Sequence, residues 1–184
     1  MHAMRTYVRN YVPGGTFFLT AVTYRRSRFL TSPLSRGLLA RALRDVRAAW
    51  PFDVLAAVLL PDHLHTIWAL PPRDADFSVR MQKVKEFFTK AWVEAGGQEA
   101  VPTPSEAGRR HRGVWQARFW EHTVRDEADL KRCADYLHWN PVKHGLVQRV
   151  ADYPWSSFHR YLRLGEYDAA WGREDPCPDF AMPE

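Results

Sequence analysis

The sequence predicts an α+β domain with a ferredoxin-like, split βαβ antiparallel sheet, helices on one face and one additional helix. Runs rich in β-branched and aromatic residues alternate with amphipathic helical runs in the order β-α-β-β-α-β-α. The two middle strand-like runs are separated only by a Pro-Asp pair, which is typical of a tight turn. A chain of 184 residues with 46% hydrophobic and 14% aromatic side chains is also large enough for one packed core.

The N-terminal part of this pattern is a strand, a helix and a strand. Residues 16–24 (TFFLTAVTY) follow a Gly-Gly turn and predict the first strand. Residues 36–50 repeat apolar side chains at helical spacing with arginines between them, and Pro51 ends this helix. Residues 53–60 are apolar without a break after Asp53, which indicates a strand buried on both faces.

The middle of the chain predicts a hairpin and a second helix. The turn at Pro61 leads into residues 63–70, so this strand is expected to pair with the one before it. After a loop at residues 71–76, apolar side chains at helical spacing predict an amphipathic helix over residues 79–95. Two glycines directly after residue 95 are expected to end it.

The C-terminal part predicts one more strand and one more helix. Residues 98–112 are polar and are expected to form a loop. The tryptophans and phenylalanine of residues 113–124 (GVWQARFWEHTV) predict the fourth strand. Asp126 is a good N-cap for a third helix, which is expected to run to Asn140 and to end at Pro141.

Two histidines lie on the strand that follows the Pro-Asp turn. Residues i and i+2 of a strand point to the same face, so His63 and His65 project together. The alternate residues, among them Leu64 and Trp68, are mostly large and apolar, and that face is expected to meet the helices. The imidazoles are then left on the open face. They are either part of a metal site or exposed histidines of a polar face, since two ligands alone are too few for a site.

The third helix offers two further polar candidates. Its apolar stripe is Leu130, Ala134 and Leu137, and each helical residue advances by about 100°. By this count Tyr136 and Asn140 lie toward the edge of the stripe and are neighbours one turn apart. Each is also consistent with a simpler role, as a stripe-edge tyrosine and as a helix stop before proline.

Together these motifs resemble those of a known family. PDHLH is followed far downstream by FWEHTVRDEADLKRCADYLHWNPVKHGLV and then by DYPWSSFHRY. In this order they resemble the REP-associated tyrosine transposases, a branch of the single-tyrosine HUH transposases, over about residues 16–161. The resemblance implies His63 and His65 as metal ligands, and Asn140 as the third ligand where related enzymes often use glutamine. It also implies the same ferredoxin-like fold, with Tyr136 as the nucleophile on the additional helix.

The activity implied by the resemblance is metal-dependent cleavage and rejoining of single-stranded DNA near hairpin (REP-type) sequences, through a 5′-phosphotyrosine intermediate. Mixed nitrogen and oxygen ligands are compatible with Mg²⁺ or Mn²⁺, and the sequence does not choose between them. The alternative is a domesticated protein that binds DNA hairpins without cutting them, although the intact ligand and tyrosine set favours the enzyme. A two-histidine phosphodiesterase is disfavoured because HLHT lacks the paired His-x-Thr/Ser motifs of that chemistry. A generic RNA-binding module would leave the histidine pair without a purpose.

The distribution of charge is consistent with a polyanion as partner. The net charge is +5, and residues 171–184 contribute −3 through four acids and one arginine, so residues 1–170 carry +8. The side chains expected at DNA are cations, hydroxyls and one stacking tryptophan. They are Arg25, Arg26, Lys83, Lys85, Arg112, Arg118, Lys143, Trp155, Ser156, Ser157 and Arg160.

One domain is expected over residues 1–170, with a DNA-contacting segment at about residues 150–165 and a flexible acidic, Pro-rich tail at residues 171–184. The two cysteines form no disulfide framework, and no apolar run approaches the roughly 20 residues of a membrane helix. The N-terminus also lacks the apolar segment of a secretory signal. We therefore expect a cytoplasmic prokaryotic protein, nucleoid-associated when bound to DNA, with no membrane partner. The sequence is compatible with a monomer or a homodimer.

Overall fold

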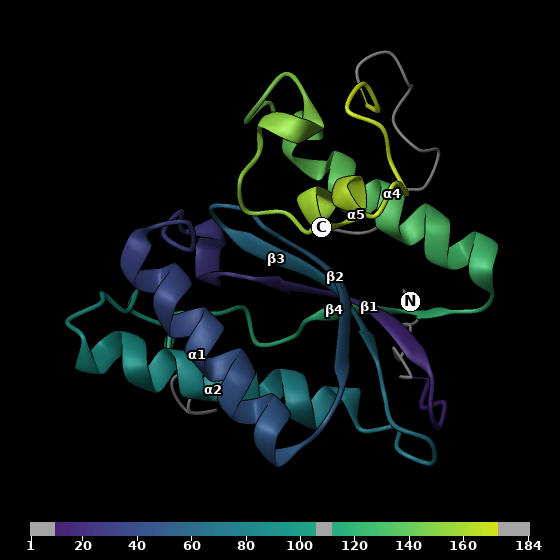
Figure 1. The fold of residues 1–184 in the computed structure, drawn as a ribbon. Coiled ribbons are helices and arrows are strands. Elements are labelled where there is room, and N and C mark those ends of the chain that lie inside the picture. Colours follow the sequence, from purple (N-terminus) through teal and green to yellow (C-terminus); the bar gives the residue numbers. More distant parts are fainter. Residues whose placement is uncertain (1–9, 106–111, 173–184) are drawn as a thin grey trace, which may run out of the picture.

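The computed structural model describes residues 10–105 and 112–172, and it has the predicted α+β architecture. Four strands form one antiparallel sheet in the order β2-β3-β1-β4, which is the split βαβ arrangement (Figure 1). The strands are β1 (Thr16–Val22), β2 (Asp53–Leu59), β3 (His63–Ala69) and β4 (Trp120–Val124). Most of the acidic tail, residues 173–184, lies outside the described residues.

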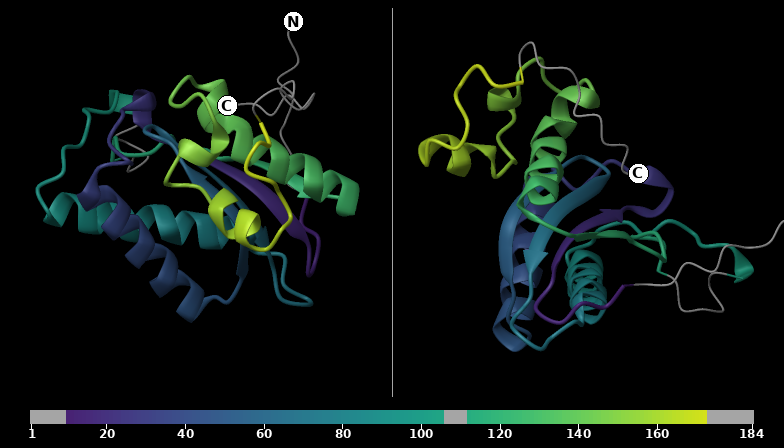
Figure 2. Two further views of the ribbon diagram at one scale, coloured as in Figure 1. Left: turned by 45° about the horizontal axis from the view of Figure 1, so that its top comes forward. Right: turned by 90° about the vertical axis from the view of Figure 1, so that its right-hand side faces the viewer.

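Helices cover both faces of the sheet. On one face, α1 (Pro33–Ala49) and α2 (Phe77–Glu94) lie side by side. On the other face lies α4 (Glu127–Lys143), with the short α5 (Phe158–Arg163) beside it (Figures 1 and 2). The additional helix is therefore the cover of the second face. None of the described helices is long and apolar enough to cross a membrane.

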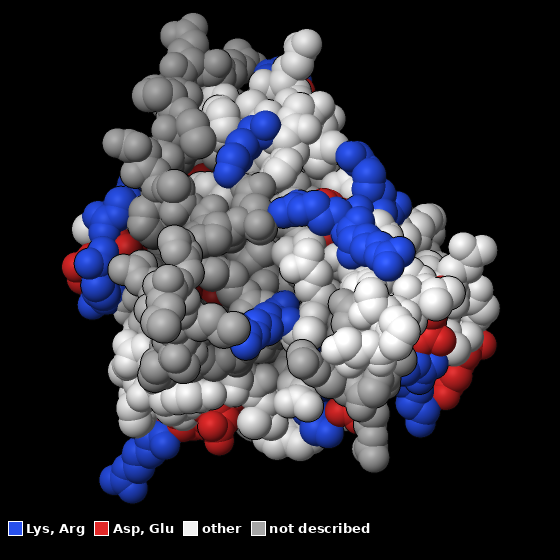
Figure 3. Space-filling model, turned by 180° about the vertical axis from the view of Figure 1, so that it is seen from behind, with Lys and Arg blue, Asp and Glu red and all other residues white. Residues whose placement is uncertain are grey.

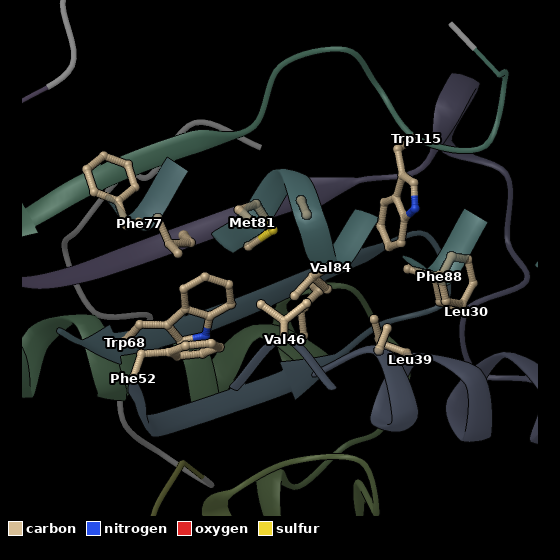
Figure 4. Packing of buried hydrophobic residues seen from close by; sticks show 14 of the residues in the cluster. Leu30, Leu39, Val46, Phe52, Trp68, Phe77, Met81, Val84, Phe88 and Trp115 are labelled. Carbon is tan, nitrogen blue, oxygen red and sulfur yellow. The ribbon is translucent and has the colours of Figure 1, made fainter. Parts of the chain in front are cut away.

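The alternation of side chains along the strands builds two cores. The larger core lies between the sheet and α1 and α2, where the ring of Trp68 on β3 packs at a tilt against Phe52 with 4.2 Å between ring centroids (Figure 4). The smaller core lies under α4 and contains Phe18, Ile67 and Leu137. Because β3 contributes to both cores, odd-numbered positions such as Ile67 face α4 and even-numbered positions face α1 and α2.

β2 is an edge strand of the sheet. Both of its faces are covered, as predicted, because Ala56 and Val58 are buried in the smaller core and Val54 and Leu59 pack against the larger one. Its outer edge is covered by a segment from near the C-terminus. The Leu59 N–H donates to the Trp155 carbonyl at 2.9 Å, and the Ser157 N–H donates to the Ala57 carbonyl at 2.8 Å. This pairing satisfies the outer backbone of β2, which is otherwise exposed at a sheet edge. An apolar run does not reveal whether a strand or a loop segment provides that cover.

The fourth strand is shorter than predicted, because only residues 120–124 pair with β1 over a continuous stretch. The chain before it makes one isolated bridge, between Trp115 and Thr23, and then leaves the sheet. Its path is held instead by a side chain from α2, because the Lys85 ammonium donates to the Gln116 carbonyl at 2.6 Å. The aromatic residues continue from the connection at residues 113–119 into β4, so aromatic content alone did not show where the strand begins.

α4 continues to Lys143, so the predicted stop before Pro141 was also wrong. A proline lacks the backbone N–H, but within the last turn it removes only one helical hydrogen bond. The next bonds are intact, as the His144 N–H donates to the Asn140 carbonyl at 2.9 Å. The extra turn adds Lys143 to the helix.

The start of α4 is fixed by a buried carboxylate, Asp129. It accepts hydrogen bonds from His122 Nε2 at 2.9 Å, the Arg125 backbone N–H at 3.0 Å and the Arg132 guanidinium at 3.1 Å. Burial by itself raises the pKa of Asp129, but the bonds from Arg125 and His122 outweigh it and hold the pKa well below its ordinary value. The carboxylate therefore ties β4 to α4 in its charged form.

We expect Asp129→Ala to lower the free energy of unfolding at pH 7 by about 2 kcal/mol, because it removes the charged acceptor of three hydrogen bonds where β4 meets α4. The folded pKa is depressed, so the stabilisation is fully present above the unfolded pKa of about 3.9 and is lost as the pH falls. Urea unfolding should therefore show a smaller difference between wild type and variant at pH 3 than at pH 7. A difference that does not change with pH would contradict the assignment of a charged carboxylate.

Candidate functional site

The fold brings four sequence-predicted residues together between β3 and α4. His63 and His65 project from β3, and Tyr136 and Asn140 project from α4. The prediction that the imidazoles lie on an open face was wrong, because α4 covers that face. The two histidines and the asparagine are 0% exposed and Tyr136 is 2% exposed. The same face carries Ile67, which gives α4 an apolar floor to pack against.

The face that α4 turns to the sheet differs from the predicted stripe. Cys133, Tyr136 and Asn140 are buried there, whereas Leu130 and Ala134 are only partly buried. Tyr136 and Asn140 therefore lie near the centre of the buried face and not at its edge. Hydrophobicity alone misplaced the stripe, because it counts an asparagine and a phenol as polar and hence as outward.

The two imidazoles are held by hydrogen bonds on one side of each ring. The rings lie 4.7 Å apart between centroids. His63 Nδ1 lies 2.7 Å from the Asp62 carboxylate, and His65 Nδ1 lies 2.8 Å from the Thr20 hydroxyl. With each Nδ1 engaged, the Nε2 atom remains, and both Nε2 atoms are buried with no hydrogen-bond partner among the described residues. An orientation of this kind is typical of histidines that bind a metal.

Asn140 completes the cluster. Both polar atoms of its side-chain amide are buried, again with no hydrogen-bond partner in the part of the chain that the structure describes. Burial first, and then the electrostatic effect of the neighbouring His63, lower the pKa of His65 well below its ordinary value, and the neighbouring Asn140 amide acts in the opposite direction. His65 is therefore a neutral imidazole with a lone pair to offer. Leaving such groups buried and unsatisfied costs about 1–3 kcal/mol each, so this cluster of two nitrogens and an amide oxygen suits a divalent cation.

A chain of hydrogen bonds supports His63 from behind. The Arg26 guanidinium donates to the Asp62 carboxylate at 3.0 Å, and that carboxylate accepts from His63. Burial raises the pKa of Asp62, but His63 and Arg26 outweigh it and hold the pKa well below its ordinary range. An ionised Asp62 can only accept from His63, so Nδ1 is engaged with Asp62 and Nε2 is the ring atom that faces the site. Asp62 and Thr20 are site residues that the sequence analysis missed, although Asp62 directly precedes the histidine pair.

The loop that carries Arg26 has two residues with unfavourable backbone angles beside this contact. Arg25 and Arg26 have φ angles of 52° and 53°, in the left-handed region that non-glycine residues rarely adopt. The Thr23 hydroxyl donates to the Asp62 carbonyl at 2.9 Å, so the loop also braces the turn before the histidines. Arg26, expected at DNA, thus has an internal partner at the site.

The phenol of Tyr136 lies beside the histidine pair. Its ring meets the His65 ring edge-on at 5.7 Å and the Phe18 ring at 6.0 Å. The Lys143 ammonium donates a hydrogen bond to the phenol oxygen at 3.0 Å. A potential nucleophile and two imidazoles are therefore gathered in one buried place, and the exposed Lys143 reaches the phenol oxygen from its edge.

A second cluster, of His122, Asp129 and Cys133, has atoms within metal-ligand range of one another and was not predicted. Asp129 is already bonded to Arg125 and Arg132. Burial raises the pKa of the Cys133 thiol to about 12, so that it stays protonated, whereas the thiolate is the form that binds metals. We assign this cluster to the support of α4.

Several residues expected at DNA have partners within the protein. Ser157 Oγ accepts from the Ala57 N–H and is bonded to His138, both at 2.9 Å. Burial lowers the pKa of this histidine to about 3, so it is neutral and structural. Arg160 donates to the Leu55 carbonyl at 2.9 Å. These contacts explain how the C-terminal segment is held against β2.

The remaining basic residues are spread over the molecule. Lys83 and Lys85 lie on α2, across the sheet from the histidines, and the structure does not bring them to the site. Arg112 pairs with Glu99, and Arg118 is exposed. Seen from behind the view of Figure 1, Lys and Arg side chains stand in several separate groups (Figure 3).

Three more residues expected at DNA, Arg25, Trp155 and Ser156, also contact other parts of the protein. Arg25 lies over the Tyr24 ring at 5.0 Å, and the Trp155 ring lies under the Arg36 guanidinium, also at 5.0 Å. Ser156 makes a bridge to β2. Trp155 also packs against the edge of the smaller core under α4.

Comparisons with known proteins agree with the fold. No protein-family model matches the chain. A REP-associated tyrosine transposase of Escherichia coli K12 is 40% identical over 182 residues, or 98% of each chain. A relative from Haemophilus influenzae is 36% identical over 170 residues, covering 92% of this chain and 94% of that protein. Among solved structures, a REP-associated tyrosine transposase bound to a REP hairpin matches with a TM-score of 0.77 and 36% identity. That match covers 98% of this chain and 100% of the other.

Proposed function

The chain belongs to the family of REP-associated tyrosine transposases, and from this premise we propose that it cleaves and rejoins single-stranded DNA beside hairpin sequences. The observation that carries the proposal is the buried cluster of Tyr136, His63, His65 and Asn140. It combines a nucleophile with three side chains suited to a cation. A related protein has been solved with a REP hairpin bound, which supports hairpin DNA as the substrate class.

In the proposed reaction the Tyr136 oxygen attacks the scissile phosphorus. The bond between that oxygen and phosphorus forms as the bond from phosphorus to the 3′ oxygen of the leaving strand breaks. The phenol gives its proton to solvent, and the leaving 3′ oxygen takes up a proton and becomes a free hydroxyl. The product is a 5′-phosphotyrosine, which a 3′-hydroxyl can attack in the reverse sense. Because the phosphodiester energy is kept in the intermediate, rejoining needs no ATP.

His63, His65 and Asn140 are the residues that would hold a divalent ion, Mg²⁺ or Mn²⁺. Such an ion, when bound, polarises the scissile phosphate and offsets the charge that develops on it. Asp62 and Thr20 fix the two rings so that each presents Nε2 to the site.

The proposal is tested with a single-stranded oligonucleotide that contains a hairpin, a duplex of the same sequence, and Mn²⁺ or EDTA. We expect the protein to cut the single strand in Mn²⁺ and to remain joined to one product on a denaturing gel. Neither the duplex nor the EDTA sample should give this product. Tight binding of the hairpin without any cleavage would replace the proposal with that of a non-cleaving hairpin-binding protein.

A further inference from the structure

Lys143 occupies a special place relative to the tyrosine. Its Nζ atom lies 3.0 Å from the phenol oxygen of Tyr136 and 4.9 Å from the centre of the same ring. The two residues are seven positions apart on α4, close to two helical turns, and so share one side of the helix. This contact exists because the helix continues past Pro141 to Lys143.

The surroundings make this cation effective. Tyr136 is 2% exposed, and its ring packs against Phe18 and the imidazole of His65. Negative charge on the phenol oxygen is poorly solvated in such a place. Lys143 is itself exposed, but its ammonium group lies at hydrogen-bond distance from this buried oxygen, where a cation stabilises negative charge more than it does in water.

We propose that Lys143 is a catalytic residue, whose ammonium group stabilises the negative charge on the Tyr136 oxygen both when the tyrosine attacks and when it leaves. The proposal rests on the proposed function, which supplies the two steps. During cleavage, the phenol proton passes to solvent while Lys143 keeps its three protons and its hydrogen bond. During rejoining, the incoming 3′-hydroxyl gives its proton to solvent as its oxygen bonds to phosphorus, and the bond from phosphorus to the tyrosine oxygen breaks. The tyrosine then departs as a phenolate held by the lysine.

The rival role for Lys143 is the one expected from the sequence, a contact to the DNA backbone. The two roles affect different quantities. A phosphate contact changes the affinity for DNA and its dependence on salt. A residue that acts on the tyrosine oxygen in the transition state changes the rate at saturating DNA and leaves the affinity nearly unchanged.

The test compares wild type with Lys143→Met, Lys143→Arg and the control Lys90→Met. Lys90 lies on α2, on the other face of the sheet, and its side chain is 77% exposed. Single-turnover formation of the covalent adduct is measured at saturating hairpin DNA in Mn²⁺. The dissociation constant of the same DNA is measured in a Tyr136→Phe background. We expect Lys143→Met to be slower by about 10²–10³-fold with less than about a threefold change in affinity. Lys143→Arg should recover much of the rate, and Lys90→Met should match wild type.

A rate at saturation equal to wild type, or a loss confined to affinity, would overturn the role of Lys143 while leaving the proposed function intact. A wild-type protein that forms no adduct would contradict the proposed function itself and the role that depends on it. The contact is also measured without turnover, by the ¹⁹F resonance of 3-fluorotyrosine placed at position 136. Its chemical shift should change in Lys143→Met and not in Lys90→Met, and an unchanged shift would contradict the hydrogen bond.

Discussion

Tyr136→Phe is expected to form no covalent complex with hairpin-bearing single-stranded DNA and to cut it at least about 10⁴-fold more slowly than wild type. The substitution removes only the oxygen that would attack phosphorus. The ring, which fills the core under α4, stays in place. Its hydrogen-bond partner Lys143 is exposed and can turn to water. The free energy of unfolding should therefore change by no more than about 1 kcal/mol.

A second buried tyrosine of the same core provides the matched control. The Tyr153 hydroxyl donates to the Leu59 carbonyl at 2.7 Å, and the residue is 3% exposed. Tyr153→Phe should lose a comparable hydrogen bond and still form the adduct at close to the wild-type rate. An adduct that persists in Tyr136→Phe would remove this tyrosine as the nucleophile.

His63→Ala is expected to abolish metal-dependent cutting and to leave most of the DNA affinity intact. It removes one of the three proposed ligands, and the remaining imidazole and amide are too few to hold a divalent ion. The effect on metal is measured by thermal unfolding with Mn²⁺. At a concentration 100 times the dissociation constant, wild type should gain about 2.7 kcal/mol of stability. His63→Ala should gain almost none.

The control for this loss is His138, a buried histidine on α4. His138 is 0% exposed and is bonded to Ser157, away from the ligand set. His138→Ala should lower stability without metal and still gain stability when Mn²⁺ is added. If His63→Ala keeps the full gain from Mn²⁺, or unfolds without metal present, His63 is a structural histidine and not a ligand.

Much of the fold could be predicted because local patterns determine it. The order of strands and helices follows from the spacing of apolar residues, and the i, i+2 spacing of His63 and His65 correctly placed both rings on one face. The same patterns could not predict that a helix covers the face of the sheet that carries the two histidines. That helix is α4, whose buried side carries Asp129 and Asn140 and therefore does not look apolar. The polar residues on the buried side of α4 made that side look solvent-facing in the sequence.

The basic residues illustrate a different limit. A cation that binds a phosphate and a cation that binds a distant carbonyl look alike in a sequence. Arg160 is bonded to Leu55, and Lys85 to Gln116, partners that no local pattern identifies. Lys143 was expected at DNA by the same reasoning, and it lies at the phenol oxygen. Its position depends on the helix continuing through a proline, where the sequence predicts a stop.

Peptide mapping of the covalent complex tests most directly whether Tyr136 takes the DNA strand. Wild-type protein is incubated with the hairpin-bearing single strand and Mn²⁺, digested with trypsin and nuclease, and analysed by mass spectrometry. We predict a nucleotide 5′-phosphate on the peptide of residues 133–143, with fragment ions that assign it to Tyr136. A modification on any other residue, or cleaved DNA with no protein attached, would contradict the proposed nucleophile and the reaction built on it.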